Sequence, residues 1–266
     1  MKFLSAEREG FEPSIRFNPY NKLATCRFQP LSHLSVEGRV PNFFCGRDCS
    51  ARYTFRMQKS SRGIYTVLGK GAQAYDRFLD VSGYRRSVED TIRALPFRSD
   101  APLRVLDAGS GTGPYTLAVL RQFPRARVTA FDLDRGLVAR LNENIAERGF
   151  ANRAHALVGD LTHPPEEVKA SSYDLIITSG VLEYVPLKET ARTLAALLAP
   201  GGRFLSSPVR TNALGHAIAR LYGCKPYSRQ ENVDAFTAQG LMLEKAAPQR
   251  PYNSASFKDV LVFVKR

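Results

Sequence analysis

A short apolar run followed by three alternating glycines constrains this 266-residue chain more than any other feature. Residues 103–106 read Leu-Arg-Val-Leu, which is typical of a buried strand, and Gly109, Gly111 and Gly113 follow. Pro114 comes next, and proline suits the first turn of a helix because its missing N–H is not needed there. A strand, a glycine turn and a helix start predict a loop where backbone passes close to a ligand, and the free N–H groups at the helix start then face an anion such as a carboxylate or phosphate.

Strand-like and helix-like segments alternate after residue 100, and hydrophobic residues make up 44% of the chain. This alternation favours an α/β fold with a largely parallel sheet. Further strands are expected at residues 127–132, 154–158, 173–178 and 203–207, followed by two candidates at 241–244 and 259–264. Helix-period apolar residues predict helices near 115–123, 137–149, 187–198, 212–227 and 231–239.

The residues from Val105 to Gly113 resemble motif I of the class I S-adenosylmethionine (SAM)-dependent methyltransferases. The resemblance covers residues 72–266 and implies a Rossmann-like sheet, mostly parallel with one antiparallel strand, flanked by helices and with a helical N-terminal cap. It also implies that Asp107 contacts the methionine part of SAM. The dinucleotide fingerprint would instead require a glycine where this chain has Pro114. A glycine turn without a ligand is the simpler alternative.

Two further acids follow strands in the pattern of the same family. Asp132 ends a strand roughly 20 residues beyond the glycines, the spacing expected for a carboxylate that binds a ribose diol. The alternative role, a helix N-cap, fits Asp134 better. Asp160 and Leu161 match the positions that border the adenine, although an aspartate in such a place is more commonly a turn residue.

The resemblance therefore implies a SAM site built from the loop, the two acids, their apolar neighbours, the end of the fourth strand and an N-terminal tyrosine. Its residues are Asp107, Gly109, Ser110, Gly111, Gly113, Asp132, Leu133, Asp160, Leu161, Ser179 and Tyr75.

The segment after the fourth strand bears on the acceptor. The family often has a polar pair such as His-His there, whereas this chain has Glu183 and Tyr184. It also lacks the D/N-P-P-Y/F signature of DNA, RNA and protein amino-group methylation. We therefore expect a small-molecule or lipid acceptor.

The SAM-binding domain is expected to comprise residues 99–266, with an insertion at 208–230. Two segments precede it in the chain. Residues 57–98 have helix-period apolar residues and are expected to form the cap. Tyr75-Asp76 resembles a segment that often precedes motif I, so Tyr75 either contacts SAM or packs on the sheet. Residues 1–56 show no sustained period and are expected to be irregular.

Residues 1–34 resemble the conceptual translation of a tRNA gene, because Gly10-Phe11-Glu12-Pro13 is what a T-arm sequence encodes. We hypothesise that the natural protein begins at Met57. This region also contains four residues of metal-binding type: Cys26, His33, Cys45 and Cys49. Their spacing matches no common zinc finger.

Methyl transfer from a sulfonium needs alignment more than chemical assistance, and a base only for a nucleophile that carries a proton. No catalytic residue is identified from the sequence. Candidates near the pocket mouth are Glu183, Tyr184, Tyr75, His163 and Arg210, each of which is more typical of packing or of the surface. The four histidines, His33, His155, His163 and His216, show no metal-ligand spacing, so we expect no metal.

A formal net charge of +13 favours anionic partners without choosing among them. An RNA methyltransferase is therefore an alternative, and a nucleotide-binding oxidoreductase or a non-catalytic module is a further one. No apolar run approaches the ~20 residues that span a bilayer. The lack of a secretory leader and the four cysteines favour a reducing cytoplasm. The sequence specifies neither the acceptor nor the oligomeric state.

Overall fold

The computed structural model describes residues 71–249 and 257–266, all of which belong to one compact unit, Asp48–Arg266. The segment 1–56, which the sequence predicts to be irregular, lies outside the described residues, together with its cysteines and histidine and the proposed start at Met57. The helix that contains Tyr75 is described, but the side chain of Tyr75 is not.

Seven strands form one sheet in the order β3-β2-β1-β4-β5-β7-β6. The strands are β1 Arg104–Ala108, β2 Arg127–Asp132, β3 Ala154–Val158, β4 Tyr173–Ser179, β5 Leu198–Ser207, β6 Leu241–Pro248 and β7 Asp259–Lys265. β7 runs antiparallel to both neighbours, β5 and β6, and the other pairings are parallel. The predicted fold class, a mostly parallel Rossmann-like sheet with one antiparallel strand, is confirmed.

Alternating side chains of the central strands enter two hydrophobic clusters, one on each face of the sheet. Val105 belongs to the cluster on one face and Leu106 to that on the other, and both are wholly buried. In β4, Leu175 and Ile177 likewise share the first cluster while Ile176 lies in the second. Strands buried on both faces explain the near-continuous apolar runs in the sequence.

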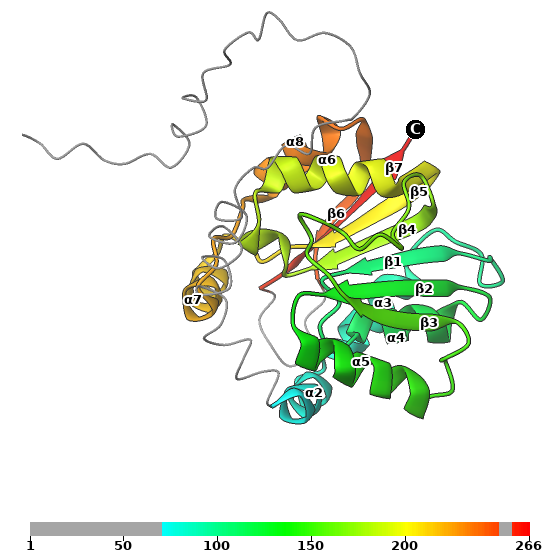
Figure 1. The fold of residues 1–266 in the computed structure, drawn as a ribbon. Helices are drawn as coiled ribbons and strands as arrows, with labels where there is room; N and C mark the ends of the chain where they lie inside the picture. The colour runs from blue at the N-terminus through cyan, green and yellow to red at the C-terminus, as the bar shows by residue number, and fades with distance from the viewer. Residues whose placement is uncertain (1–70, 250–256) are drawn as a thin grey trace, which may run out of the picture. The chain divides into compact units, whose positions relative to one another are not determined.

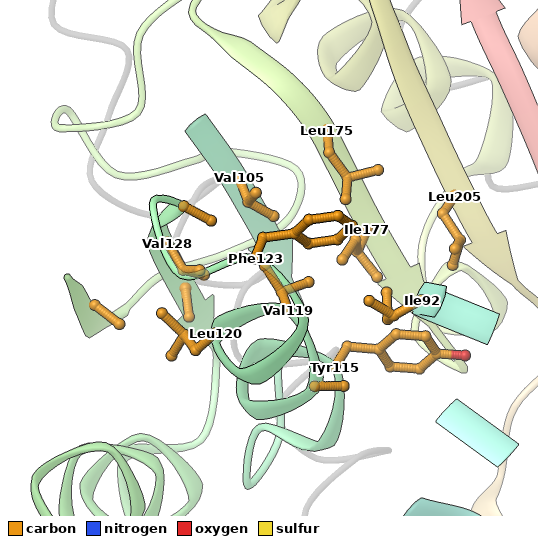
Figure 2. Close-up of a cluster of buried hydrophobic side chains, with 14 of the residues drawn as sticks. Ile92, Val105, Tyr115, Val119, Leu120, Phe123, Val128, Leu175, Ile177 and Leu205 are labelled. Carbon is orange, nitrogen blue, oxygen red and sulfur yellow. The ribbon is translucent and has the colours of Figure 1, made fainter. Parts of the chain in front are cut away.

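Helices cover both faces (Figure 1). The helices are α2 Ala72–Val81, α3 Tyr84–Arg93, α4 Pro114–Gln122, α5 Arg135–Glu147, α6 Leu187–Leu197, α7 Ala213–Tyr222 and α8 Arg229–Thr237, with a 3₁₀ turn η2 at Leu182–Tyr184. α3, α4 and α5 contribute to the first cluster, and α6 and α8 to the second. Figure 2 shows part of the first cluster, in which Ile92, Tyr115 and Phe123 gather against β1 and β4.

The predicted helical segment 57–98 contains two helices within its described part. α3 buries Val88 and Ile92 completely, in the same cluster as α4. It is therefore part of the layer that covers the sheet, whereas α2 brings Leu79 to the cleft described below. In residues 71–249 and 257–266, no helix combines the length and the apolar composition needed to cross a bilayer.

Candidate functional site

A cleft of about 570 Å³ lies where β1, β2 and β4 end. Its walls come from the glycine loop, the residues after β2 and β4, helix α7 and the residues just before β7. Nine of the predicted site residues line it: Asp107, Gly109, Ser110, Gly111, Asp132, Leu133, Asp160, Leu161 and Ser179. Carboxyl ends of parallel strands are the usual position of a ligand in α/β sheets.

The backbone of the glycine loop is held by internal hydrogen bonds. The N–H groups of Gly109 and Ser110 both donate to the Phe131 carbonyl, at 2.8 and 3.0 Å, and Gly113 donates to the Ser110 carbonyl at 2.9 Å. The Gly111 N–H donates to a carboxylate oxygen of Asp132 at 2.8 Å. The N–H groups of these four residues are therefore occupied within the protein and do not face a ligand.

The glycines are required by both conformation and space. Gly109 and Gly113 have φ values of 78° and 85°, in the left-handed region that disfavours side chains. A Cβ on Gly113 would lie 2.1 Å from a methyl carbon of Leu141, and one on Gly109 would lie 2.5 Å from Val181. Gly113 therefore packs the loop against α5, which explains why it does not itself line the cleft.

Asp107 is buried, with 2% of its surface exposed. One carboxylate oxygen accepts from the Thr116 hydroxyl at 2.6 Å and from the Thr116 backbone N–H at 3.0 Å. Burial raises the pKa of Asp107 to about 6, against the two hydrogen bonds, which lower it. Asp107 thus satisfies a free N–H of the first turn of α4. A cationic ligand beside it would stabilise the charged form of this buried carboxylate.

Asp132 lies one strand away and joins the loop to the end of β2. One of its oxygens accepts from Gly111, and the other accepts from the Asp134 N–H at 3.0 Å. Each carboxylate oxygen has a second lone pair, so Asp132 can still accept from ligand hydroxyls. Burial raises the pKa of Asp132. Asp134 caps α5 by accepting from the N–H groups of Gly136 and Leu137, as predicted.

Leu133, Asp160 and Leu161, which follow β2 and β3, also line the cleft. Leu133 is 44% exposed although it is a large apolar side chain, and Leu161 is buried. One oxygen of Asp160 accepts from the hydroxyl and the N–H of Thr162 at 2.7 and 2.8 Å, the turn geometry that the simpler interpretation anticipated.

Two buried hydroxyls in the loop point to a ligand. The side-chain oxygens of Ser110 and Thr112 are buried and have no hydrogen-bond partner among the described residues, and both residues line the cleft. Buried hydroxyls without partners are uncommon in native structures. Together with the two acids, they fit a polar ligand that has cationic and hydroxyl groups.

Lys258 and Tyr84, which the sequence interpretation missed, form a cluster with the predicted site residue Ser179. The Lys258 ammonium donates to the Ser179 hydroxyl at 2.8 Å and to the Tyr84 hydroxyl at 3.1 Å. The two hydroxyls are themselves 3.1 Å apart. Lys258, Tyr84, Ser179 and Tyr115 all line the cleft. No local pattern marks Lys258, because it precedes β7 and meets Tyr84 only through the antiparallel placement of that strand.

The candidates named for the pocket mouth separate in the structure. Tyr184 lines the cleft. Glu183 lies behind it, 4% exposed, and accepts from the Val209 N–H, while burial raises its pKa. His163 is exposed and away from the cleft, and Arg210 pairs with Asp259 at 3.4 Å. Within the described ranges, no three His, Cys, Asp or Glu side chains are grouped as metal ligands.

Helix α7 supplies an apolar wall. Leu214, Ile218, Leu221 and Tyr222 line the cleft from one face of this helix. Leu221 is 67% exposed. The helix lies within the predicted insertion 208–230, and it begins with an Asn212 cap and ends at Gly223.

The strand order and the loop between two acids define the fold of the class I SAM-dependent methyltransferases. Residues 105–202 match the family model of the methyltransferase domain. This part of the chain therefore matches a methyltransferase domain.

Curated relatives and solved structures agree with this assignment. The chain is 26% identical over 144 residues to a malonyl-[acyl-carrier protein] O-methyltransferase of Geobacter sulfurreducens, covering 54% of this chain and 51% of that protein. It is 32% identical over 135 residues to a trans-aconitate 2-methyltransferase of Rhodopseudomonas palustris, covering 49% and 46%. The chain thus spans about half the length of these curated relatives.

The fold is also similar to geranyl diphosphate C-methyltransferase from Streptomyces coelicolor, solved with Mg²⁺, geranyl-S-thiolodiphosphate and S-adenosyl-L-homocysteine. The TM-score is 0.57 at 14% identity, over 67% of this chain and 75% of that one. At this identity the similarity concerns the fold.

Proposed function

We propose that this protein is a cytoplasmic enzyme that transfers a methyl group from SAM to a small-molecule or lipid acceptor. The observation that carries the proposal is the pairing of Asp107 and Asp132 on either side of the glycine loop, in one cleft with two partnerless hydroxyls. The charged form of Asp107 is stabilised by a cation such as the amino group of the methionine part. Asp132 can accept hydrogen bonds from the ribose hydroxyls.

The predicted side chains that line the cleft then have roles in binding. Asp107 receives the amino group of the methionine part, and the hydroxyls of Ser110 and Thr112 contact the same part. Asp132 accepts from the ribose hydroxyls. The remaining contacts to the donor come from the apolar side chains of Leu133 and Leu161, the carboxylate of Asp160, and Ser179. Tyr75 stays a candidate contact from α2.

SAM, when bound, supplies a methyl group on a sulfonium sulfur, from which a neutral thioether is a good leaving group. The contribution of the chain is to hold donor and acceptor in line and to keep water out, and positioning of this kind is worth up to ~7–11 kcal/mol. The internal hydrogen bonds of the glycine loop support such positioning because they fix the loop before a ligand arrives.

The acceptor side of the cleft is mostly apolar, which favours a small molecule or lipid. The two relatives and the solved structure named above are methyltransferases. Their names give malonyl-[acyl-carrier protein], trans-aconitate and geranyl diphosphate as substrates. The net charge of +13 is the one observation that favours RNA as the second candidate.

A labelling experiment separates these candidates. The full chain is incubated with SAM that carries a tritiated methyl group and with cell extract, which is then divided into lipid, small-molecule and RNA fractions. We expect label in the lipid or small-molecule fraction, and none with Asp107→Ala. Label confined to RNA would contradict the choice of acceptor, and no transfer to any fraction would contradict the enzyme assignment.

A further inference from the structure

The ammonium of Lys258 lies in the wall of the cleft, among groups that hold it in one position. It donates to Ser179 and Tyr84, and it sits 5.2 Å from the centre of the Tyr84 ring. Its backbone pairs with Val209 just before β7, so the side chain extends from the sheet across Gly180. A Cβ on Gly180 would lie 3.0 Å from the Lys258 ammonium nitrogen. A cation fixed in this way is preorganised for an anionic ligand.

Charge and burial around Lys258 agree with this interpretation. Burial lowers the pKa of Lys258, while the acidic groups of Tyr115, Glu183 and Tyr222 act in the opposite direction. Burial likewise raises the pKa of Tyr84 to about 12, so its hydroxyl stays protonated and can donate a hydrogen bond. A part-buried ammonium and a tyrosine hydroxyl at 3.1 Å from each other form a pair of donors that suits one carboxylate.

Lys258 lies where the proposed donor contacts meet the apolar wall of α7, because Ser179, one of those contacts, accepts from its ammonium at 2.8 Å. Tyr222, one of the groups that act on its charge, belongs to α7 and lines the same cleft. The apolar side chains of Leu214, Ile218 and Val185 continue the wall from there. The acids proposed to hold the donor, Asp107 and Asp132, lie near the ends of β1 and β2 instead.

We propose that Lys258 and Tyr84 bind a carboxylate of the methyl acceptor, and that the acceptor is an organic acid with an apolar body. The inference rests on the proposed function, because it assigns to the substrate the part of the cleft that the donor leaves open. Lys258 orients the acid, and the apolar wall of α7 covers the rest of the molecule.

Calorimetric titration of the full chain with octanoate and with octanamide tests this proposal, first with the protein saturated with S-adenosylhomocysteine and then without it. The two probes share an apolar chain and differ in the charge of the head group. We expect the wild-type protein to bind octanoate at least ~10-fold more tightly than octanamide, because a charge-assisted hydrogen bond is roughly twice as strong as a neutral one.

Lys258→Met is expected to abolish this preference while it lowers the affinity for S-adenosylhomocysteine by less than ~10-fold, because Ser179 loses one partner but Asp107 and Asp132 are unchanged. Lys225→Met is the matched control, because the Lys225 side chain is exposed beside Tyr227 and outside the cleft, and it should keep the preference. Tyr84→Phe removes only one hydroxyl and should reduce the preference about 3-fold, which gives a second measurement if Lys258→Met does not fold.

Equal binding of the two probes by the wild-type protein, or an unchanged preference in Lys258→Met, would overturn the proposal. A loss of S-adenosylhomocysteine affinity of ~10-fold in Lys258→Met would also overturn it, because the lysine would then serve the carboxylate of the donor. If the wild-type protein binds S-adenosylhomocysteine but shows no preference for octanoate, this inference alone fails. If it does not bind S-adenosylhomocysteine, the proposed function fails, and the acid loses its role as acceptor.

Discussion

Thr116 donates two hydrogen bonds to the same oxygen of Asp107, from its hydroxyl at 2.6 Å and from its N–H at 3.0 Å. Within the described part of the chain, the other oxygen of Asp107 accepts no hydrogen bond. One residue of α4 therefore fixes the carboxylate at the end of β1 and leaves one oxygen for the cleft that Asp107 lines. The first three predictions below concern this carboxylate and the network that holds the loop around it.

Asp107→Asn should stabilise the folded protein at neutral pH. Burial raises the pKa of Asp107 from 3.8 to about 6, so the folded state binds this proton more tightly than the unfolded state. Stability is therefore lost as the pH rises from about 4 to about 6, and the full penalty remains above that window. The shift corresponds to at most about 3 kcal/mol. Urea unfolding at pH 4 and pH 8 measures the gain in the free energy of unfolding, which we expect at pH 8 alone. A variant at pH 8 that is no more stable than the wild type would contradict the prediction.

The affinity for the donor should fall as the pH is lowered through about 6. An ammonium ligand needs the ionised form of Asp107, and protonation of a group with a pKa of about 6 competes with binding below that pH. We expect a loss of roughly 10-fold per pH unit below about 6. Calorimetric titration with S-adenosylhomocysteine between pH 4.5 and 7.5 measures it. Asp107→Asn should bind more weakly and without this pH dependence, and the same slope in the variant would assign the effect to another group.

Asp76→Asn should weaken the attachment of α2 to the loop. Asp76 pairs with Arg85 at 2.8 Å and with Arg140 at 3.1 Å, and it accepts from Asn144, which also donates to the Thr112 carbonyl. Only 8% of its side chain is exposed. Removal of one partner from a buried ion pair costs about 3 kcal/mol.

The matched control is Asp100→Asn, since the Asp100–Arg98 pair is 58% and 85% exposed. Its cost should stay within about 0.5 kcal/mol. Urea unfolding of both variants gives the comparison, and similar costs for the two would show that the Asp76 network has little weight in stability.

Gly113→Ala should destabilise the protein more than Gly111→Ala. Both glycines have positive φ, at 85° and 56°, so alanine costs about 1–2 kcal/mol at either position. A methyl group on Gly113 also meets buried Leu141, whereas one on Gly111 meets nothing within 4 Å. Overpacking adds about 1–3 kcal/mol at Gly113 alone. Thermal unfolding of the two variants measures the order, and a larger loss for Gly111→Ala would contradict it.

The fold could be predicted because the local sequence patterns of the strands, helices and turns all indicate the same architecture. The buried strands are apolar on both faces, the helices keep their period, and the loop glycines stand where positive φ and close packing require them. The same consistency made Asp107 and Asp132 recognisable, since each directly follows an apolar run that ends at the same edge of the sheet.

The rest of the site depends on contacts between segments that are distant in the chain. Lys258 meets Tyr84 because β7 returns antiparallel beside β5, and no local pattern predicts which residue that strand brings there. The N–H groups of the glycine loop likewise find their acceptors, Phe131 and Asp132, on another strand. In both cases the pairing of distant strands determines which residues meet, and a single sequence does not specify that pairing.

The most direct test is the affinity of the full chain for SAM, measured by calorimetry against NAD as competitor. We predict that SAM binds at one site, that NAD does not displace it, and that Asp107→Ala and Asp132→Ala each reduce the affinity at least ~10-fold. If the wild-type protein has no measurable affinity for SAM, or if NAD displaces it, the methyltransferase proposal is contradicted.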